Sequence, residues 1–279
     1  MSDTAIHIDS VQLEYFVQSH GARRILNGID LQIESGEFVS IVGQTGCGKS
    51  TLLRLILGEE KPTSGRVLVN GRERMQPDRV CGYVPQKYSL FPDKTVLDNV
   101  TFGLDVSEFG TFSVLRPSRR KKVKEFRAAA SRYLELTGFH EADSRKYPHQ
   151  LSGGMQQRVA IAQALILKPA FLLMDEAFSA LDPGTRSGMQ QLIKEVWRQS
   201  GTTIVFVTHN TREAVCLGTR VVALARDGDR GSSVALDVAV PHLDFDSNED
   251  EIQDFIDEVE CATRSAGGLA RPRPIHAFS

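Results

Sequence analysis

The chain opens with two stretches in which apolar and polar residues alternate, residues 6–16 and 26–33. A period of two is typical of strands that bury one face and expose the other. Residues 19–24, between the two stretches, are predicted to form the connecting turn. The start of the chain therefore predicts an N-terminal antiparallel β subdomain.

A different pattern follows: four later runs are short and mostly apolar, at residues 38–42, 171–174, 204–208 and 221–225. Such runs are expected of parallel strands that are buried on both faces. Helical patterns at residues 49–57 and 185–199 lie between them, so strand and helix alternate. The chain therefore predicts an α/β fold with a mixed sheet.

From about residue 96 to about residue 167 the β pattern disappears, and helical segments such as residues 122–136 replace it. This change predicts an inserted α-helical subdomain within one domain of residues 1–240.

Residues 241–279 differ from the rest of the chain. They begin acidic, with apolar side chains at helical spacing, Ile252, Phe255, Ile256 and Val259. From residue 263 onward Arg, Pro, Gly and Ala prevail. We therefore expect an acidic C-terminal extension that contains a short docking helix and ends in a flexible tail.

Charge and composition exclude several classes of protein. The 33 Lys and Arg residues nearly balance the 35 Asp and Glu residues, for a formal charge of −2, so no global basic field favours nucleic acid. The longest apolar runs fall far below the roughly 20 residues of a membrane-spanning helix. The start of the chain lacks the pattern of a signal peptide. Residues 116–127 hold seven basic side chains, expected to form a solvated helix face, with contact to a membrane subunit or lipid headgroups as the alternative.

The first candidate chemistry follows the strand predicted at residues 38–42. There the chain reads Gly43, Gln44, Thr45, Gly46, Cys47, Gly48, Lys49, Ser50, Thr51 and continues as a helix. Glycines in this pattern turn successive backbone N–H groups inward at a helix start, where they bind phosphate oxygens. Lys49 places a cation between the outer phosphates, and the Ser50 hydroxyl is a ligand for Mg²⁺. The segment predicts ATP binding by a P-loop NTPase core.

A second candidate lies where the apolar run at residues 171–174 leads into two carboxylates, Asp175 and Glu176. By itself, an acidic pair at a strand end also fits the cap of a following helix. Beside a phosphate loop, Asp175 is expected to hold Mg²⁺ and Glu176 to polarise the attacking water as general base.

The third candidate is the start of a predicted helix at residues 151–157, where Gly153 and Gly154 follow Ser152. Ser152 is a good N-cap residue, but an ordinary cap does not account for two glycines, each of which costs about 1 kcal/mol of helix propensity. They are explained if a phosphate approaches this helix start, where N–H groups and the helix dipole form a second anion site.

Residues 151–157 resemble the signature motif of ABC-transporter ATPases, and the similarity covers residues 6–225. In that family the motif meets ATP held by the phosphate loop of a partner subunit, which implies a head-to-tail dimer. Other motifs of the family match in order. Gln86 resembles the glutamine-loop residue, which is expected to reach Mg²⁺ or the attacking water. Asp182 ends a segment similar to the loop after the catalytic carboxylate, and His209 resembles the switch histidine that contacts the γ-phosphate.

Tyr15 matches the aromatic residue that stacks on adenine in this family, with the adjacent Phe16 as a competitor. One departure is Ala177, where many members have proline. Residues 174–183 are similar to importer ATPases for osmoprotectants, whereas the overall layout is similar to those for nitrate, sulfonates or taurine. The cargo and the direction of transport therefore stay open, with import favoured by the resemblance.

The resemblance implies a peripheral ATPase subunit at the cytoplasmic face of the inner membrane, paired with an identical chain or a close relative. Its further partners would be integral membrane permease subunits and a solute-binding protein. A non-transport ABC ATPase is the alternative class, although the long coiled-coil insertions or tandem cassettes of those proteins do not occur here. A phosphate-loop kinase would leave residues 151–157 without a role.

Cys47 lies inside the predicted phosphate loop, where a positive field lowers the pKa of a thiol. This position suggests that Cys47 is more reactive than Cys81, Cys216 and Cys261. No paired spacing among the four cysteines suggests zinc, and we expect all four to be free thiols.

Overall fold

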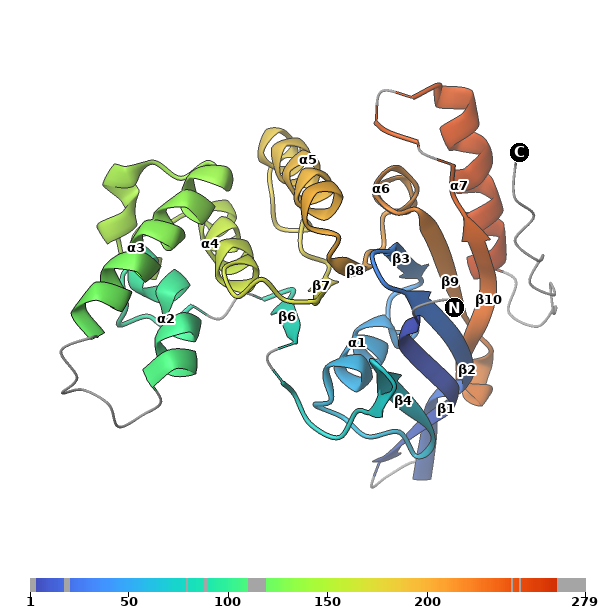
Figure 1. Ribbon diagram of the computed structural model, residues 1–279. Coiled ribbons are helices and arrows are strands. Elements are labelled where there is room, and N and C mark those ends of the chain that lie inside the picture. The colour runs from blue at the N-terminus through green and yellow to red at the C-terminus, as the bar shows by residue number, and fades with distance from the viewer. Residues whose placement is uncertain are drawn as a thin grey trace. The chain divides into compact units, whose positions relative to one another are not determined.

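The structure is a computed structural model, shown in Figure 1, and describes residues 4–17, 21–78, 80–87, 90–109, 119–241, 243–245 and 247–264. Its contacts divide the chain into two compact units. The first unit comprises residues 1–78, 173–176 and 199–279, and the second comprises residues 79–172 and 177–198.

Antiparallel strands form one edge of the sheet in the first unit: β1 (Thr4–Val17), β2 (Gly21–Glu34), β4 (Ser64–Val69) and β5 (Arg72–Glu73). β1 pairs with both β2 and β4, and its inward-facing residues Ile6, Ile8 and Val11 are fully buried. The alternating pattern is thus confirmed as a half-buried hairpin. The predicted turn at residues 19–24 is wrong at its end, because residues 21–24 are extended and pair with residues 14–17.

The centre of this sheet consists of strands that are buried on both faces: β3 (Phe38–Gly43), β7 (Phe171–Asp175), β8 (Thr203–Val207) and β9 (Arg220–Arg226). β3 pairs in parallel with β8 on one side and β9 on the other. β10 (Ser232–Ala239) pairs antiparallel with β9 and joins this group to β2. The strand order is β5-β4-β1-β2-β10-β9-β3-β8-β7, so the predicted mixed sheet is confirmed.

Three α-helices of the first unit pack on this sheet: α1 (Lys49–Leu57), α6 (Thr211–Leu217) and α7 (Glu249–Arg264). A 3-10 turn, η3 (Gly228–Arg230), follows β9. The helix expected from the apolar spacing after residue 250 is α7, which buries Ile252, Ile256 and Val259 and lies against α6, β9 and β10 (Figure 1). In the predicted flexible tail, Thr263 and Arg264 are the last residues of α7, and residues 265–279 lie outside the described residues.

The second unit is largely helical, as predicted for the middle of the chain. It contains α2 (Val96–Phe109), α3 (Arg119–Leu136), the 3-10 turns η1 (Glu141–Arg145) and η2 (Pro148–Gln150), α4 (Gly153–Leu165) and most of α5 (Pro183–Ser200). α2, α3 and α4 surround one core that includes Val100, Leu134 and Val159 (Figure 1). β6 (Cys81–Val84) lies beside the first residues of β7.

In the basic run 116–127, Lys122 forms an ion pair with Glu108, and Arg127 Nη2 lies 3.1 Å from Asp98 Oδ1. Residues 116–118 of that run lie outside the described residues. None of the helices described in either unit combines the length and the apolar content that a membrane crossing needs.

Candidate nucleotide site

The predicted phosphate loop connects the end of β3 to the start of α1. β3 is fixed between two parallel neighbours, so the position at which the loop begins is set by the sheet. Two positions require glycine for steric reasons. A Cβ atom on Gly43 would lie 2.5 Å from the Leu224 carbonyl oxygen, and one on Gly48, at φ +93°, would lie 2.8 Å from a methyl carbon of Leu26.

Lys49 occupies the interior of this loop. Its ammonium group donates hydrogen bonds to the carbonyl oxygens of Gly43 at 2.8 Å and Gln44 at 3.2 Å, and the residue is only 5% exposed. The Cys47 N–H also donates to the Gln44 oxygen, at 3.2 Å. A buried cation is therefore held at the start of a helix, the arrangement that binds phosphate oxygens.

Ser50 and Asp175 meet although they come from α1 and the end of β7. The Ser50 hydroxyl donates to Asp175 Oδ1 at 2.9 Å. Burial raises the pKa of Asp175, the Ser50 hydrogen bond opposes that rise, and the nearby charge of Glu176 adds to it. Hydroxyl and carboxylate oxygens are ligands that suit Mg²⁺, which proteins hold with one or two carboxylates together with substrate phosphates. No cluster of three His, Cys, Asp or Glu side chains suited to a metal occurs among the residues that the structure describes.

Glu176 adopts a backbone conformation that is unusual for a residue with a side chain, at φ +45°. Its N–H donates to the Val207 carbonyl oxygen at 2.9 Å, which fixes it against the end of the neighbouring strand β8. Its carboxylate Oε2 lies 3.4 Å from His209 Nδ1. Left-handed non-glycine residues cost about 1–3 kcal/mol and cluster at functional sites, so this conformation supports a functional role for Glu176.

The segment around His209 is held by contacts that our sequence analysis missed. The buried Thr208 hydroxyl donates to Glu213 Oε2 at 2.9 Å and accepts from the Asn210 N–H at 3.0 Å. Asn210 in turn caps α6, because its side-chain oxygen accepts from the Glu213 N–H at 3.1 Å. The residues on both sides of His209 are therefore fixed by the start of α6. An Asn followed three residues later by Glu is a capping pattern that would have indicated this start.

Tyr15 and Phe16 are neighbours on β1 and therefore point to opposite faces of the sheet. Phe16 is 90% exposed, whereas Tyr15 is partly buried against α1. The Tyr15 hydroxyl group contacts Glu60 and lies 3.5 Å from Arg54 Nη2. Burial and the Glu60 hydrogen bond raise the pKa of Tyr15. Of the two rings, Tyr15 lies beside the helix that begins with Lys49.

The remaining predicted residues belong to the second unit. Ser152 caps α4, since its hydroxyl accepts from the Met155 N–H at 3.3 Å, and Gly153 is the first helical residue. A Cβ on Gly154 would lie 3.3 Å from Leu181 Cδ2, so Gly154 packs closely against the loop before α5. Asp182 accepts from the Thr185 N–H at 3.1 Å, a bond that lowers the pKa of Asp182. Gln86 is exposed and follows β6.

The prediction that Cys47 is unusually reactive is wrong. Its side chain is 1% exposed, and this burial raises the pKa of the thiol despite the opposing charge of Lys49. A higher pKa leaves less thiolate at neutral pH, and the thiolate is the reactive form. The loop sequence indicated the nearby positive charge but not the burial.

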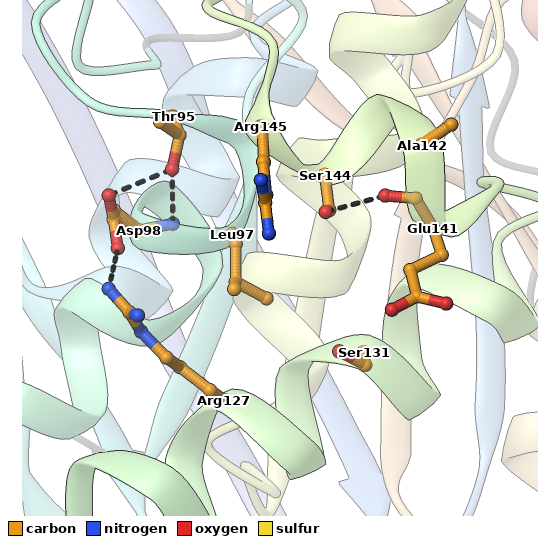
Figure 2. Close-up of a pocket in the computed structure, with 9 residues that line it drawn as sticks. All are labelled: Thr95, Leu97, Asp98, Arg127, Ser131, Glu141, Ala142, Ser144 and Arg145. Carbon is orange, nitrogen blue, oxygen red and sulfur yellow. Dashed lines mark hydrogen bonds and ion pairs between the residues drawn. The ribbon is translucent and has the colours of Figure 1, made fainter.

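The second unit also contains a cavity of about 680 Å³ between α2, α3 and η1, which Figure 2 shows. Its lining residues are mostly polar: Thr95, Leu97, Asp98, Arg127, Ser131, Glu141, Ala142, Ser144 and Arg145. Asp98 is held on one wall by Thr95 at 2.8 Å and by Arg127 at 3.1 Å (Figure 2). The cavity is thus lined by both acidic and basic side chains, and Asp98 on its acidic wall is already held by hydrogen bonds.

Comparisons with known proteins cover most of the chain. The family model described as "ABC transporter" matches residues 26–179. An uncharacterized ABC transporter ATP-binding protein of Methanocaldococcus jannaschii is 43% identical over 219 residues, which are 78% of this chain and 77% of the relative. The aliphatic sulfonates import ATP-binding protein SsuB of Pseudomonas putida is 41% identical over 224 residues, which are 80% of this chain and 76% of that protein.

Solved structures give the same result for the fold. A dimeric ATP-binding cassette in a post-hydrolysis state, bound to ADP and Pi, aligns with a TM-score of 0.72 at 32% identity. The alignment covers 85% of this chain and 99% of that chain. The predicted fold, a P-loop core with a mixed sheet, an antiparallel β subdomain and an inserted helical subdomain, is confirmed.

The raised pKa of Asp175 predicts how substitution changes stability. Because its folded-state pKa lies above the unfolded value, the stabilisation from the protonated form is present at low pH and is lost as pH rises through the folded pKa. Without nucleotide, Asp175→Asn should therefore raise Tm at pH 8, and the gain should vanish below about pH 4. Thermal denaturation across pH tests this, with the exposed Asp254→Asn as control. A lower Tm for Asp175→Asn at pH 8 would contradict the assignment of a costly buried carboxylate.

Proposed function

Because this chain belongs to the ABC transporter family, as its ATP-binding and ATP-hydrolysing subunit, we propose that residues 43–51 hold the triphosphate of ATP. The observation that carries the proposal is the hydrogen bond between Ser50 and Asp175, which joins the phosphate loop to the strand end that bears Glu176. Lys49, already held inside the loop, supplies the cation for the outer phosphates. The adenine ring stacks on Tyr15.

The same geometry supports the hydrolytic roles that we propose. Glu176 accepts the proton of the attacking water, and its strained backbone keeps the carboxylate at the end of β7. His209 lies beside Glu176, with Nδ1 3.4 Å from Oε2, and its ring contacts the γ-phosphate, where charge develops during hydrolysis. Thr208 and Glu213 position His209 rather than contact the nucleotide.

Ser50 and Asp175 are the residues that would hold Mg²⁺. When bound, Mg²⁺ neutralises phosphate charge. The oxygen ligands present fit this ion. Burial raises the pKa of Asp175, and a bound cation would compensate the charge of that buried carboxylate.

The helix start at residues 152–154 is the second phosphate-binding face. Its glycines allow close approach of a γ-phosphate to backbone N–H groups of α4. In the proposed mechanism this phosphate is bound to the phosphate loop of a second copy or a close relative, and Asp182 lies at the same contact. ATP then joins the two chains, and hydrolysis lets them separate. The solved relative described as a dimeric cassette supports this arrangement.

Glu176→Gln tests the catalytic assignment. The amide keeps the shape of the side chain but cannot accept a proton, so turnover should fall by about 10²- to 10⁴-fold while ATP binding persists. The variant should also remain dimeric with ATP in size-exclusion chromatography. Glu125→Gln, an exposed substitution on α3, is the matched control. Wild-type turnover of Glu176→Gln would remove Glu176 from this role.

The cavity in the second unit is the proposed docking site for the integral membrane subunits. Its lining includes Thr95, which immediately precedes α2. Asp98 and Arg145 offer opposite charges to a polar segment of a partner, and the ordered acidic wall reduces the entropy lost on binding. Through this contact the chain would be peripheral at the cytoplasmic face of the membrane.

A charge reversal in the cavity tests the docking site. Arg145→Glu should leave ATP turnover of the isolated chain unchanged and reduce copurification with the membrane subunits at least tenfold, because like charges oppose each other across the contact. Arg132→Glu, an exposed position on α3 outside the cavity lining, is the control. Copurification of Arg145→Glu at the wild-type level would place the contact elsewhere.

The proposed cargo is a small sulfonate, imported with the help of a solute-binding protein. The support is the similarity to relatives named for aliphatic sulfonates import, at 37–41% identity. An osmoprotectant is the alternative that residues 174–183 suggest.

Uptake by vesicles that contain the copurified complex decides between these cargoes. A labelled alkanesulfonate should accumulate with ATP and should not with the Glu176→Gln chain. Accumulation of glycine betaine or nitrate in place of the sulfonate would overturn the cargo assignment and leave the ATPase roles intact.

A further inference from the structure

The phosphate loop is also held from the outside, by side chains and backbone of the C-terminal part of the chain. Arg226, at the end of β9, donates through Nη1 to the Gly46 carbonyl oxygen at 3.3 Å. The Gln44 side-chain amide donates to the Thr263 carbonyl oxygen in the last turn of α7 at 3.4 Å. We propose that Arg226 and the last turn of α7 are positioning elements that set the affinity of this loop for ATP. This inference rests on the proposed role of residues 43–51.

The Arg226 contact acts on the turn inside the loop. The Cys47 N–H bonds the Gln44 carbonyl oxygen, which closes a four-residue turn, and Gly46 has the φ of +79° that the third position of a type II turn requires. Because a peptide unit is planar, the direction of the Gly46 carbonyl fixes the direction of the Cys47 N–H. Arg226 thus keeps a carbonyl dipole turned outward, away from the place where phosphate oxygens would bind.

The guanidinium of Arg226 is oriented before it meets the loop. Its Nε donates to the Gly228 carbonyl oxygen at 3.1 Å, within the turn that follows β9. A donor that is already fixed loses less entropy when it holds the loop, so the hydrogen bond restricts the loop more effectively. Arg226 also brings positive charge near the loop, since its charge opposes the rise in the pKa of Cys47.

The second contact ties the loop to α7. The last four carbonyl groups of a helix have no partner within the helix, and the Gln44 amide satisfies one of them. Thr263 is held in turn, because its hydroxyl donates to the Glu260 carbonyl oxygen at 2.9 Å. Gln44 is therefore fixed on two sides, by Lys49 through its backbone oxygen and by α7 through its side chain.

α7 itself is anchored beside the site along its length. Ile256 and Val259 pack in one cluster with Val42, near the end of the strand that leads into the phosphate loop. At the other end of the helix, Arg212 donates from Nη1 and Nη2 to the two carboxylate oxygens of Glu249, at 2.5 and 2.8 Å. Arg212 follows His209 by three residues. The helix thus connects the phosphate loop with the segment after the histidine. The hydrogen bonds given above for Arg226 and Thr263 go to the loop, to Gly228 and to Glu260.

This geometry predicts an effect on ATP affinity rather than on the chemical step. Arg226→Ala should raise KM for ATP roughly tenfold, the loss expected for one charge-assisted hydrogen bond, and keep kcat within about twofold. Arg226→Lys, which retains a cationic donor, should recover part of that affinity. Gln44→Ala, an exposed position that needs no repacking, should raise KM about threefold. Arg230→Ala is the matched control, since this exposed arginine of the same turn forms its ion pair with Asp227.

Steady-state ATPase assays and nucleotide titrations of the full chain give both parameters, and Tm shows whether each variant folds. Wild-type KM in both Arg226→Ala and Gln44→Ala overturns the inference. A fall in both kcat and Tm of these variants with KM unchanged also overturns it, because a purely structural role would give that result. Lys49→Ala separates this inference from the proposed role of residues 43–51. If Lys49→Ala keeps wild-type ATP affinity, the proposed phosphate loop itself fails. If Lys49→Ala loses ATP binding while Arg226→Ala and Gln44→Ala do not, only the proposed effect of the Arg226 and Gln44 contacts is refuted.

Discussion

A triphosphate can be held at a protein surface only where several N–H groups and a cation face the same point, and the rest of this structure depends on that requirement. Lys49 meets it by lying inside the loop between β3 and α1, bonded to the oxygens of Gly43 and Gln44. The loop can be this tight because β3 is fixed between β8 and β9, and because Gly43 and Gly48 have no side chain where neighbouring atoms leave no room for one. The buried sheet therefore serves to place one cation and one helix start.

Two features of the site that destabilise the fold lie at the end of β7. Asp175 is a buried carboxylate with a raised pKa, and Glu176 is held in a left-handed conformation. Both features oppose folding. In the proposed function a bound cation would compensate the first, and the second places the Glu176 carboxylate beside His209. Local destabilisation at these positions is consistent with a site that is completed only by ligand.

Much of the fold was predictable because burial leaves a pattern in the sequence. A strand buried on one face, such as β1, alternates apolar and polar residues, whereas a strand buried on both faces, such as β3, is a short apolar run. The phosphate loop was predictable because its glycines, Lys49 and Ser50 form one continuous pattern in the sequence. Contacts that join distant parts of the chain were not, since Arg226 lies 180 residues from Gly46 and Thr263 lies 219 residues from Gln44. The error on Cys47 has the same origin, because its neighbours in sequence reveal charge and its neighbours in space determine burial. The roles of all the predicted site residues, from Tyr15, the phosphate loop and Glu176 to Gln86, Ser152, Gly153, Gly154 and Asp182, remain predictions.

The central claim is that one ATP molecule is bound between the phosphate loop of one chain and the α4 helix start of another. A crystal structure of the Glu176→Gln variant with Mg²⁺ and ATP tests it most directly. The account predicts a γ-phosphate within hydrogen-bond distance of Lys49 in one copy and of the Gly153 backbone N–H in its partner. A nucleotide-bound structure in which Gly153 lies far from every γ-phosphate, including those of neighbouring copies, would contradict it.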